Sequence, residues 1–149
     1  MQKIIRTATI VLSALILFNC SSKKLQSSEK FQWDNYTLEE ATKLTKNKLI
    51  MIDFYADWCS PCHLLDKNTF TNHDVIQYCK ENFINLKINT DTEYGYEVYK
   101  EFNVESLPKI LFINSNRNII GDINGYHDPK DYLNKIKKIN KEFLSSNNK

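Results

Sequence analysis

Short apolar runs alternate along the chain with amphipathic stretches. Residues 49–55 and 84–89 are rich in β-branched and aromatic side chains and are bounded by polar residues, which predicts two buried strands. Residues 110–113 and 119–124 flank a polar Asn-Ser-Asn-Arg turn and predict a hairpin. Residues 31–33, Phe-Gln-Trp, form either a further short strand or a packing anchor.

Helices are predicted between and after these strands. Residues 37–40, Thr-Leu-Glu-Glu, form a capping box that opens a helix ending near Lys46. Further helices are expected at about residues 62–68, after a cap at Thr71 or Asn72, and at residues 94–102. A last helix opens at Asp128-Pro129 and presents an apolar face made of Tyr132, Leu133, Ile136 and Ile139. The order β-α-β-α-β-β-α predicts one α/β domain over residues 31–143, followed by a loose tail at 144–149.

The N-terminus is typical of a targeting segment. Lys3 and Arg6 precede an uncharged, mostly apolar stretch at residues 7–18, which is too short to cross a bilayer comfortably but suits a signal-peptide core. Residues 17–20, Leu-Phe-Asn-Cys, resemble a bacterial lipobox, although the residues before the cysteine are usually smaller. That resemblance implies a signal peptide at residues 1–19 and lipidation of Cys20. An uncleaved anchor with an incidental Cys20 thiol is the alternative.

Composition and charge indicate a linker after the targeting segment and bear on the kind of partner. Residues 20–30 are rich in Ser, Lys and Gln and predict a flexible tether. The formal charge of the 149-residue chain is +2, and Lys3 and Arg6 account for it, so the remainder is neutral. We therefore expect no nucleic-acid surface.

The most informative motif for the chemistry of this chain lies at residues 58–62, Trp-Cys-Ser-Pro-Cys. A buried strand ends just before them, and Pro61 suits the first turn of a helix. Free N–H groups and the helix dipole stabilise a thiolate there, the form that attacks disulfides. We expect Cys59 to be the exposed nucleophile and Cys62, one turn further, to be more buried and to attack second.

The same residues also fit a second motif. With His63 they read Cys-x-x-Cys-His, the attachment motif of c-type haem, in which His63 would bind the iron. The strand directly before the motif and the position of Pro61 favour dithiol chemistry over haem. We therefore expect no cofactor and no metal beyond the redox pair.

Several motifs together resemble the thioredoxin superfamily. Residues 53–62, Asp-Phe-Tyr-Ala-Asp-Trp-Cys-Ser-Pro-Cys, are similar to its active-site strand and turn, and Leu107-Pro108 is similar to its cis-proline turn. Thr69-Phe70 downstream makes the chain similar to the C-terminal domain of DsbD-type thiol:disulfide interchange proteins and to exported thioredoxin-like lipoproteins. The resemblance implies a central mixed β-sheet flanked by helices. His63 and Lys109 depart from the usual pattern, in which Lys or Arg and a small residue stand at these positions.

The resemblance also implies roles for single residues. Asp53 would take the proton of Cys62, and burial should raise the pKa of its carboxyl. Lys87 would be the ion partner of Asp53, or else an exposed edge residue. Asp66 matches an acidic position that tunes the thiols, or else is a solvated helix residue, and His63 could act on the thiolate. Residues expected to contact substrate are Trp58, Ser60, Pro61, Leu107 and Pro108, with Trp58 covering the disulfide.

These features predict a thiol-disulfide oxidoreductase that reduces disulfides of exported proteins and is tethered by lipid to the periplasmic side of a bacterial cell envelope. Its expected partners are disulfides of exported proteins and a membrane electron donor of DsbD type. An oxidase or isomerase uses the same chemistry in another direction, and a binding or chaperone module would leave the dithiol idle. Cys79 lies on an apolar helical stripe and is expected to be a buried, unreactive thiol.

Overall fold

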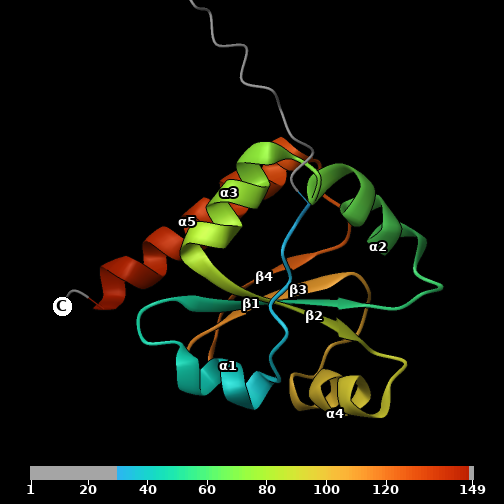
Figure 1. The fold of residues 1–149 in the computed structure, drawn as a ribbon, viewed down its shortest axis with the longest axis horizontal. Coiled ribbons are helices and arrows are strands. Elements are labelled where there is room, and N and C mark those ends of the chain that lie inside the picture. Colours follow the sequence, from blue (N-terminus) through green and yellow to red (C-terminus); the bar gives the residue numbers. More distant parts are fainter. Residues whose placement is uncertain (1–29, 148–149) are drawn as a thin grey trace, which may run out of the picture.

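The computed structural model describes residues 30–147 and shows a four-stranded sheet with helices on both faces (Figure 1). The predicted signal segment, Cys20 and nearly all of the tether lie outside the described residues. Strands β1 (Leu49–Tyr55), β2 (Phe83–Asn89), β3 (Lys109–Ile113) and β4 (Ile119–Asn124) are arranged in the order β2-β1-β3-β4. β1 is parallel to β2 and antiparallel to β3, and β4 is antiparallel to β3, so the sheet is mixed as predicted.

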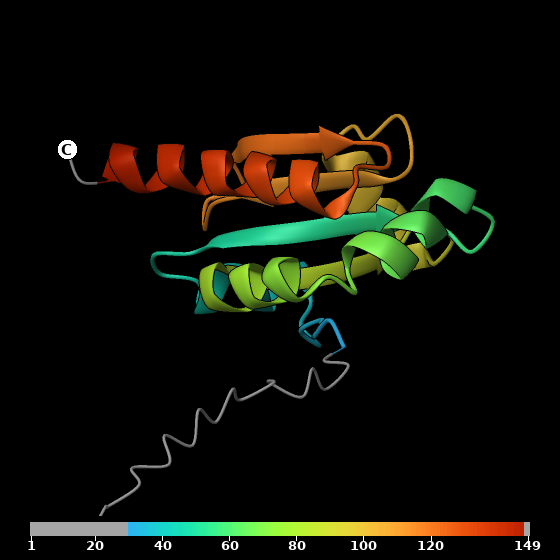
Figure 2. The ribbon, with the colours of Figure 1, turned by 90° about the horizontal axis from the view of Figure 1, so that it is seen from above.

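Helices α3 (His73–Asn82) and α5 (Pro129–Asn147) cover one face of the sheet, and α1 (Leu38–Leu44) and α4 (Glu93–Glu101) cover the other (Figure 1). The view from above shows α5 over β4 and α3 over β2 (Figure 2). Because β1 is central and covered on both faces, six of its seven residues are buried, including the acidic Asp53.

Local sequence signals account for several helix starts. The Thr37 side chain accepts the N–H of Glu40, whose carboxylate accepts the N–H of Thr37, which confirms the capping box. Asn72, rather than Thr71, caps α3. Gly125 adopts a positive φ of 75° in the segment between β4 and α5, a conformation that glycine allows at little cost.

Some predicted boundaries differ from the structure. Helix α1 ends at Leu44 rather than Lys46, and β2 starts one residue earlier, at Phe83. The tail predicted at 144–149 is wrong in part, since α5 continues to Asn147. The apolar stripe of α5 extends to the buried Phe143. Phe31 and Trp33 form no strand and instead pack against the α3–α5 side of the core, as the anchor interpretation predicted.

The helix after the active-site motif has two parts. α2 (Ser60–Leu64) is followed directly by a π-helical turn, η1 (Leu65–Thr69), where a single α-helix was expected from Cys62 to Asn68. π-helical turns are wider than α-helical ones and are often found at functional sites. Among residues 30–147, no helix has the length and apolar character needed to cross a membrane.

Candidate redox-active site

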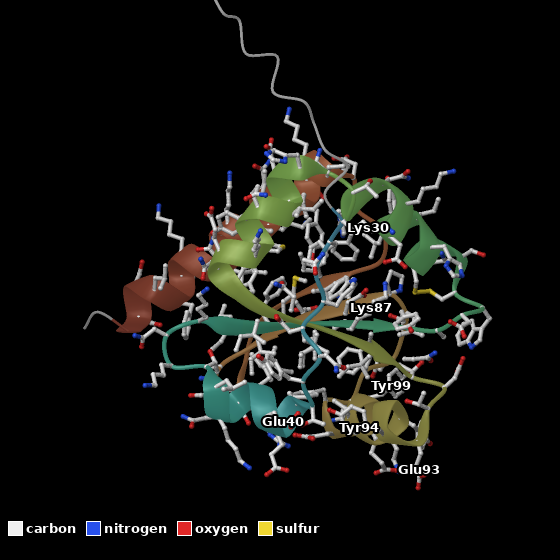
Figure 3. The ribbon with its side chains drawn as sticks, in the orientation of Figure 1. Lys30, Glu40, Lys87, Glu93, Tyr94 and Tyr99 are labelled. Atoms are coloured by element: carbon white, nitrogen blue, oxygen red, sulfur yellow. A yellow bond between two sulfur atoms is a disulfide. The ribbon has the colours of Figure 1, made fainter. Side chains whose placement is uncertain are left out.

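Cys59 and Cys62 form a disulfide at the start of α2, just after the end of β1 (Figure 3). Cys59 is the N-cap of α2, and its Sγ accepts the backbone N–H of Cys62 at 3.3 Å. Pro61 occupies the first turn, where its missing N–H costs no helical hydrogen bond. The same N–H of Cys62 is positioned to stabilise a thiolate on Cys59 once the disulfide is reduced.

The two cysteines are equally buried, each with 3% of its surface exposed. The prediction of an exposed Cys59 above a more buried Cys62 is therefore wrong for the disulfide form. The bond to Cys62 and the hydrogen bond from its N–H hold the Cys59 sulfur against the start of α2. Ala56 is buried with the pair, and Tyr55 and Leu107 pack against it.

Asp53 lies on β1, six residues before Cys59, and only 2% of its surface is exposed. Burial disfavours its charged form and raises the pKa of the carboxyl to about 6, although the Lys87 ammonium opposes the shift. One carboxylate oxygen has no hydrogen-bond partner among the described residues. A carboxyl of this kind can hold or release a proton near neutral pH.

Lys87 is the partner of Asp53 in the register of β1 and β2, and its Nζ lies 3.3 Å from Oδ2 of Asp53. It also forms an ion pair with Asp66 of η1. The lysine side chain is 16% exposed and lies on the face of the sheet that α3 covers (Figure 3). The alternative of an edge-exposed Lys87 is thus wrong, whereas the side chain of Asp66 is 38% exposed and at the same time paired with Lys87.

Trp58 and Ser60 are exposed at this end of the molecule. Trp58 is 71% exposed, and its indole N–H donates to the Asp91 carboxylate at 3.2 Å. That Trp58 covers the disulfide stays a prediction. The Leu107–Pro108 peptide bond is cis, as predicted, and Leu107 reaches the cysteines.

His63 is exposed, and its Nε2 lies 2.8 Å from the carbonyl oxygen of Asp57. A carbonyl only accepts, so this nitrogen carries the proton. The two sulfurs that haem attachment would need are bonded to each other. This arrangement favours the dithiol interpretation of the Cys-x-x-Cys-His motif.

Cys79 is buried next to Met51, and burial raises the pKa of its thiol, as expected of an unreactive cysteine. Within residues 30–147, no group of His, Cys, Asp and Glu side chains gathers as a metal site. The aromatic residues around Lys87 were not identified from the sequence. The pair Phe31 and Trp33 was visible only as a possible packing anchor.

The sheet, the buried acid and the disulfide beside a cis-proline turn together define a thioredoxin-fold disulfide oxidoreductase. The model of the thioredoxin-like domain family matches residues 35–140, and the chain belongs to this family. Its thiol-disulfide chemistry resides in the Cys59–Cys62 pair.

Individual relatives agree with this assignment. The thiol:disulfide interchange protein DsbD of Tatumella citrea is 28% identical over 108 residues, which are 70% of this chain and 19% of that protein. The solution structure of a putative disulphide-isomerase from Bacteroides thetaiotaomicron has a TM-score of 0.66 at 30% identity, covering 76% of this chain and 95% of the other. The oxidised C-terminal domain of Neisseria meningitidis DsbD shares the fold, with a TM-score of 0.56 at 22% identity, covering 67% of this chain and 87% of that domain. The chain thus spans about a fifth of the DsbD protein that it matches.

Proposed function

We propose that this protein reduces disulfides of exported proteins while tethered by lipid at Cys20 to the periplasmic side of a bacterial cell envelope. The observation that carries the proposal is that three features lie together at one end of the sheet. A disulfide at a helix start lies beside a cis-proline turn, and a buried carboxyl with a pKa of about 6 lies on the strand that leads into it.

In the first step, the Cys59 thiolate attacks one sulfur of the substrate disulfide. A bond forms between Cys59 and that sulfur, the substrate S–S bond breaks, and the other substrate sulfur leaves as a thiolate. The N–H of Cys62, which reaches the Cys59 sulfur, supports the attacking charge. The substrate segment adds beside Leu107 and Pro108 as an extended strand, bringing its sulfur to Cys59.

In the second step, Asp53 takes the proton of the Cys62 thiol, directly or through water. The Cys62 thiolate then attacks the Cys59 sulfur, the mixed disulfide breaks, and the second substrate sulfur leaves as a thiolate. The substrate has gained two electrons, and the protein ends in the disulfide form that the structure shows. Lys87 carries the countercharge when Asp53 is ionised.

A membrane thiol carrier of DsbD type then returns two electrons to the Cys59–Cys62 disulfide. Similarity to DsbD proteins over 70% of the chain supports this choice of donor. The electrons arrive by the same exchange chemistry run in reverse, with a donor thiolate attacking the disulfide.

The test is insulin-disulfide reduction by the purified protein, combined with trapping of partners in cells by Cys62→Ala. The variant keeps Cys59 but lacks the thiol that resolves the mixed disulfide, so mixed disulfides should accumulate on Cys59. A double variant that also carries Cys59→Ala is the matched control. Failure to reduce insulin, with efficient oxidation of a reduced substrate instead, would replace the reductase by an oxidase. An intact dithiol without either activity would indicate a binding module.

A further inference from the structure

Residues 31–34, which we call the strap, cross the free edge of β2. The backbone N–H of Asp34 donates to the carbonyl of Asn85 at 2.7 Å, and the Asp34 carboxylate accepts the backbone N–H of Asn85 at 2.8 Å. In Figure 1 the strap belongs to the blue segment that runs past β2 towards α1. These bonds fix the strap to β2 only two residues from Lys87.

The strap contributes two aromatic rings to the core. The ring centroids of Phe31 and Trp33 lie 4.3 Å apart, and those of Phe31 and Trp33 lie 4.8 and 5.0 Å from that of Phe70. Phe70 directly follows η1, the turn that carries Asp66. The strap is therefore packed against the same segment that supplies the second carboxylate of the site.

Of the two strap rings, Trp33 lies under the Lys87 ammonium. Nζ lies 5.1 Å from the ring centroid of Trp33, 4.7 Å from that of Tyr55 and 5.9 Å from that of Phe70. All three distances are within the range of cation–π attraction. The ammonium is thus held by three ring faces together with the carboxylates of Asp53 and Asp66.

Ring faces and carboxylates act differently on the cation. A carboxylate attracts the ammonium and partly cancels its charge, whereas a ring attracts it without adding net charge. A lysine at a strand edge otherwise extends its ammonium towards water. The ring of Trp33 therefore favours the inward position, in which Lys87 keeps its charge 3.3 Å from Asp53.

We propose that Trp33 is a positioning residue of the redox site, which holds the Lys87 ammonium against Asp53 by a cation–π contact from the strap. The proposal rests on the proposed function in one respect, because that function makes Asp53 the base for Cys62. Trp33 touches none of the reacting atoms in this scheme and acts through Lys87 alone.

The direction of the effect follows from the groups around Asp53. Lys87 faces it from β2, Asp66 from η1 and Tyr132 from α5, and of these only the ammonium favours the ionised carboxylate. Loss of the Trp33 ring lets the ammonium move towards water, which weakens its attraction to Asp53. The pKa of Asp53 should then rise, so less base is available below neutral pH and resolution by Cys62 slows there.

The experiment follows the Asp53 carboxyl directly by ¹³C NMR during a pH titration of the oxidised full chain, assigned with Asp53→Asn. We compare Trp33→Leu, Trp33→Phe and the matched control Phe31→Leu, which removes a ring from the same stack. The titration midpoint should rise by about half a pH unit or more in Trp33→Leu, a roughly threefold change in the ionisation constant. It should rise less in Trp33→Phe, which keeps a weaker ring, and stay unchanged in Phe31→Leu.

A second readout is the pH dependence of mixed-disulfide resolution, which should shift upward with the NMR midpoint and return to the wild-type rate at high pH. An unchanged midpoint in Trp33→Leu, or equal shifts in Trp33→Leu and Phe31→Leu, would overturn the proposal. If Trp33→Leu does not fold, an unchanged midpoint in Trp33→Phe overturns it instead. A shifted midpoint in a protein that does not reduce insulin would keep the positioning role and reject the reductase.

Discussion

Asp53 and Lys87 face each other across two adjacent parallel strands, with Oδ2 of the acid 3.3 Å from Nζ of the lysine. Burial and the ion pair act on the acid in opposite directions. The pKa of Asp53 is nonetheless raised to about 6, so desolvation outweighs the attraction of Lys87. The acid is thus adapted to exchange a proton rather than to hold a permanent charge.

Asp53→Asn should slow the release of the mixed disulfide more than its formation. The amide cannot accept a proton from the Cys62 thiol, whereas attack by Cys59 depends on the start of α2. Stopped-flow traces of the two phases with a model disulfide measure this. A decrease in rate confined to formation of the mixed disulfide would contradict the role of Asp53 as the base.

The same substitution should stabilise the fold at neutral pH. Between pH 3.8 and about 6 the folded protein holds a proton on Asp53 that the unfolded chain has released, so stability falls as pH rises through this window. Above about pH 6 the buried charge of Asp53 lowers the free energy of unfolding by its full amount, on the order of 2–3 kcal/mol. Urea unfolding at pH 7 should therefore show a more stable Asp53→Asn protein, and the difference should vanish below about pH 4.

Much of the fold was predictable because its signals are local. The apolar run at residues 49–55 coincides with β1, and the capping residues Thr37 and Asn72 start helices as expected. The π-helical turn after Leu64 was not predictable, because residues 65–69 have the composition of an ordinary helix. The true end of α5 was missed since its last turns carry polar residues around a single buried Phe143.

The site was predictable where chemistry is encoded in spacing, and not where it depends on tertiary contacts. Cys59, Cys62 and Asp53 follow from one contiguous motif, and Leu107-Pro108 from a second. Cys59 is buried in the disulfide form, and no sequence pattern predicts that burial. The contact of Trp33 with Lys87 joins residues 54 positions apart through a strap without periodic structure.

Cys59→Ser should abolish insulin-disulfide reduction, while Cys79→Ser should leave it nearly intact. Cys59 caps the helix start, whereas Cys79 is fully buried beside Met51 with its thiol pKa raised by burial. Initial rates at matched concentrations compare the two variants. Equal losses from both substitutions would contradict the assignment of Cys59 as the nucleophile.

Cys20→Ala should release the protein from the membrane fraction or block its maturation. The apolar stretch before Cys20 is too short to span a bilayer comfortably, so the lipid would provide the attachment. Fractionation followed by mass spectrometry of the mature protein measures both processing and acylation. An intact Met1 together with an unmodified Cys20 would reject lipidation.

The redox potential should lie nearer the reducing end of the family's range. Thioredoxin has a potential of about −270 mV, against about −120 mV for the oxidant DsbA. The residues between the cysteines influence this balance, and Ser60-Pro61 resembles the reducing proteins, whereas strong oxidants often place His before the second cysteine. A stable disulfide makes the reduced dithiol a good electron donor.

His63 acts against this expectation, because an imidazolium near Cys59 would stabilise the thiolate and favour the reduced form. In the structure its Nε2 is directed to the carbonyl of Asp57, which holds the ring at the start of α2. His63→Lys, which restores a cation usual at this position, should therefore change the potential less than replacement of Pro61 by His. Equilibration with glutathione measures the redox potential of the wild-type protein and of both variants. A wild-type potential close to that of DsbA, with the Cys59–Cys62 pair mostly oxidised in cells, would reject the reductase and favour an oxidase.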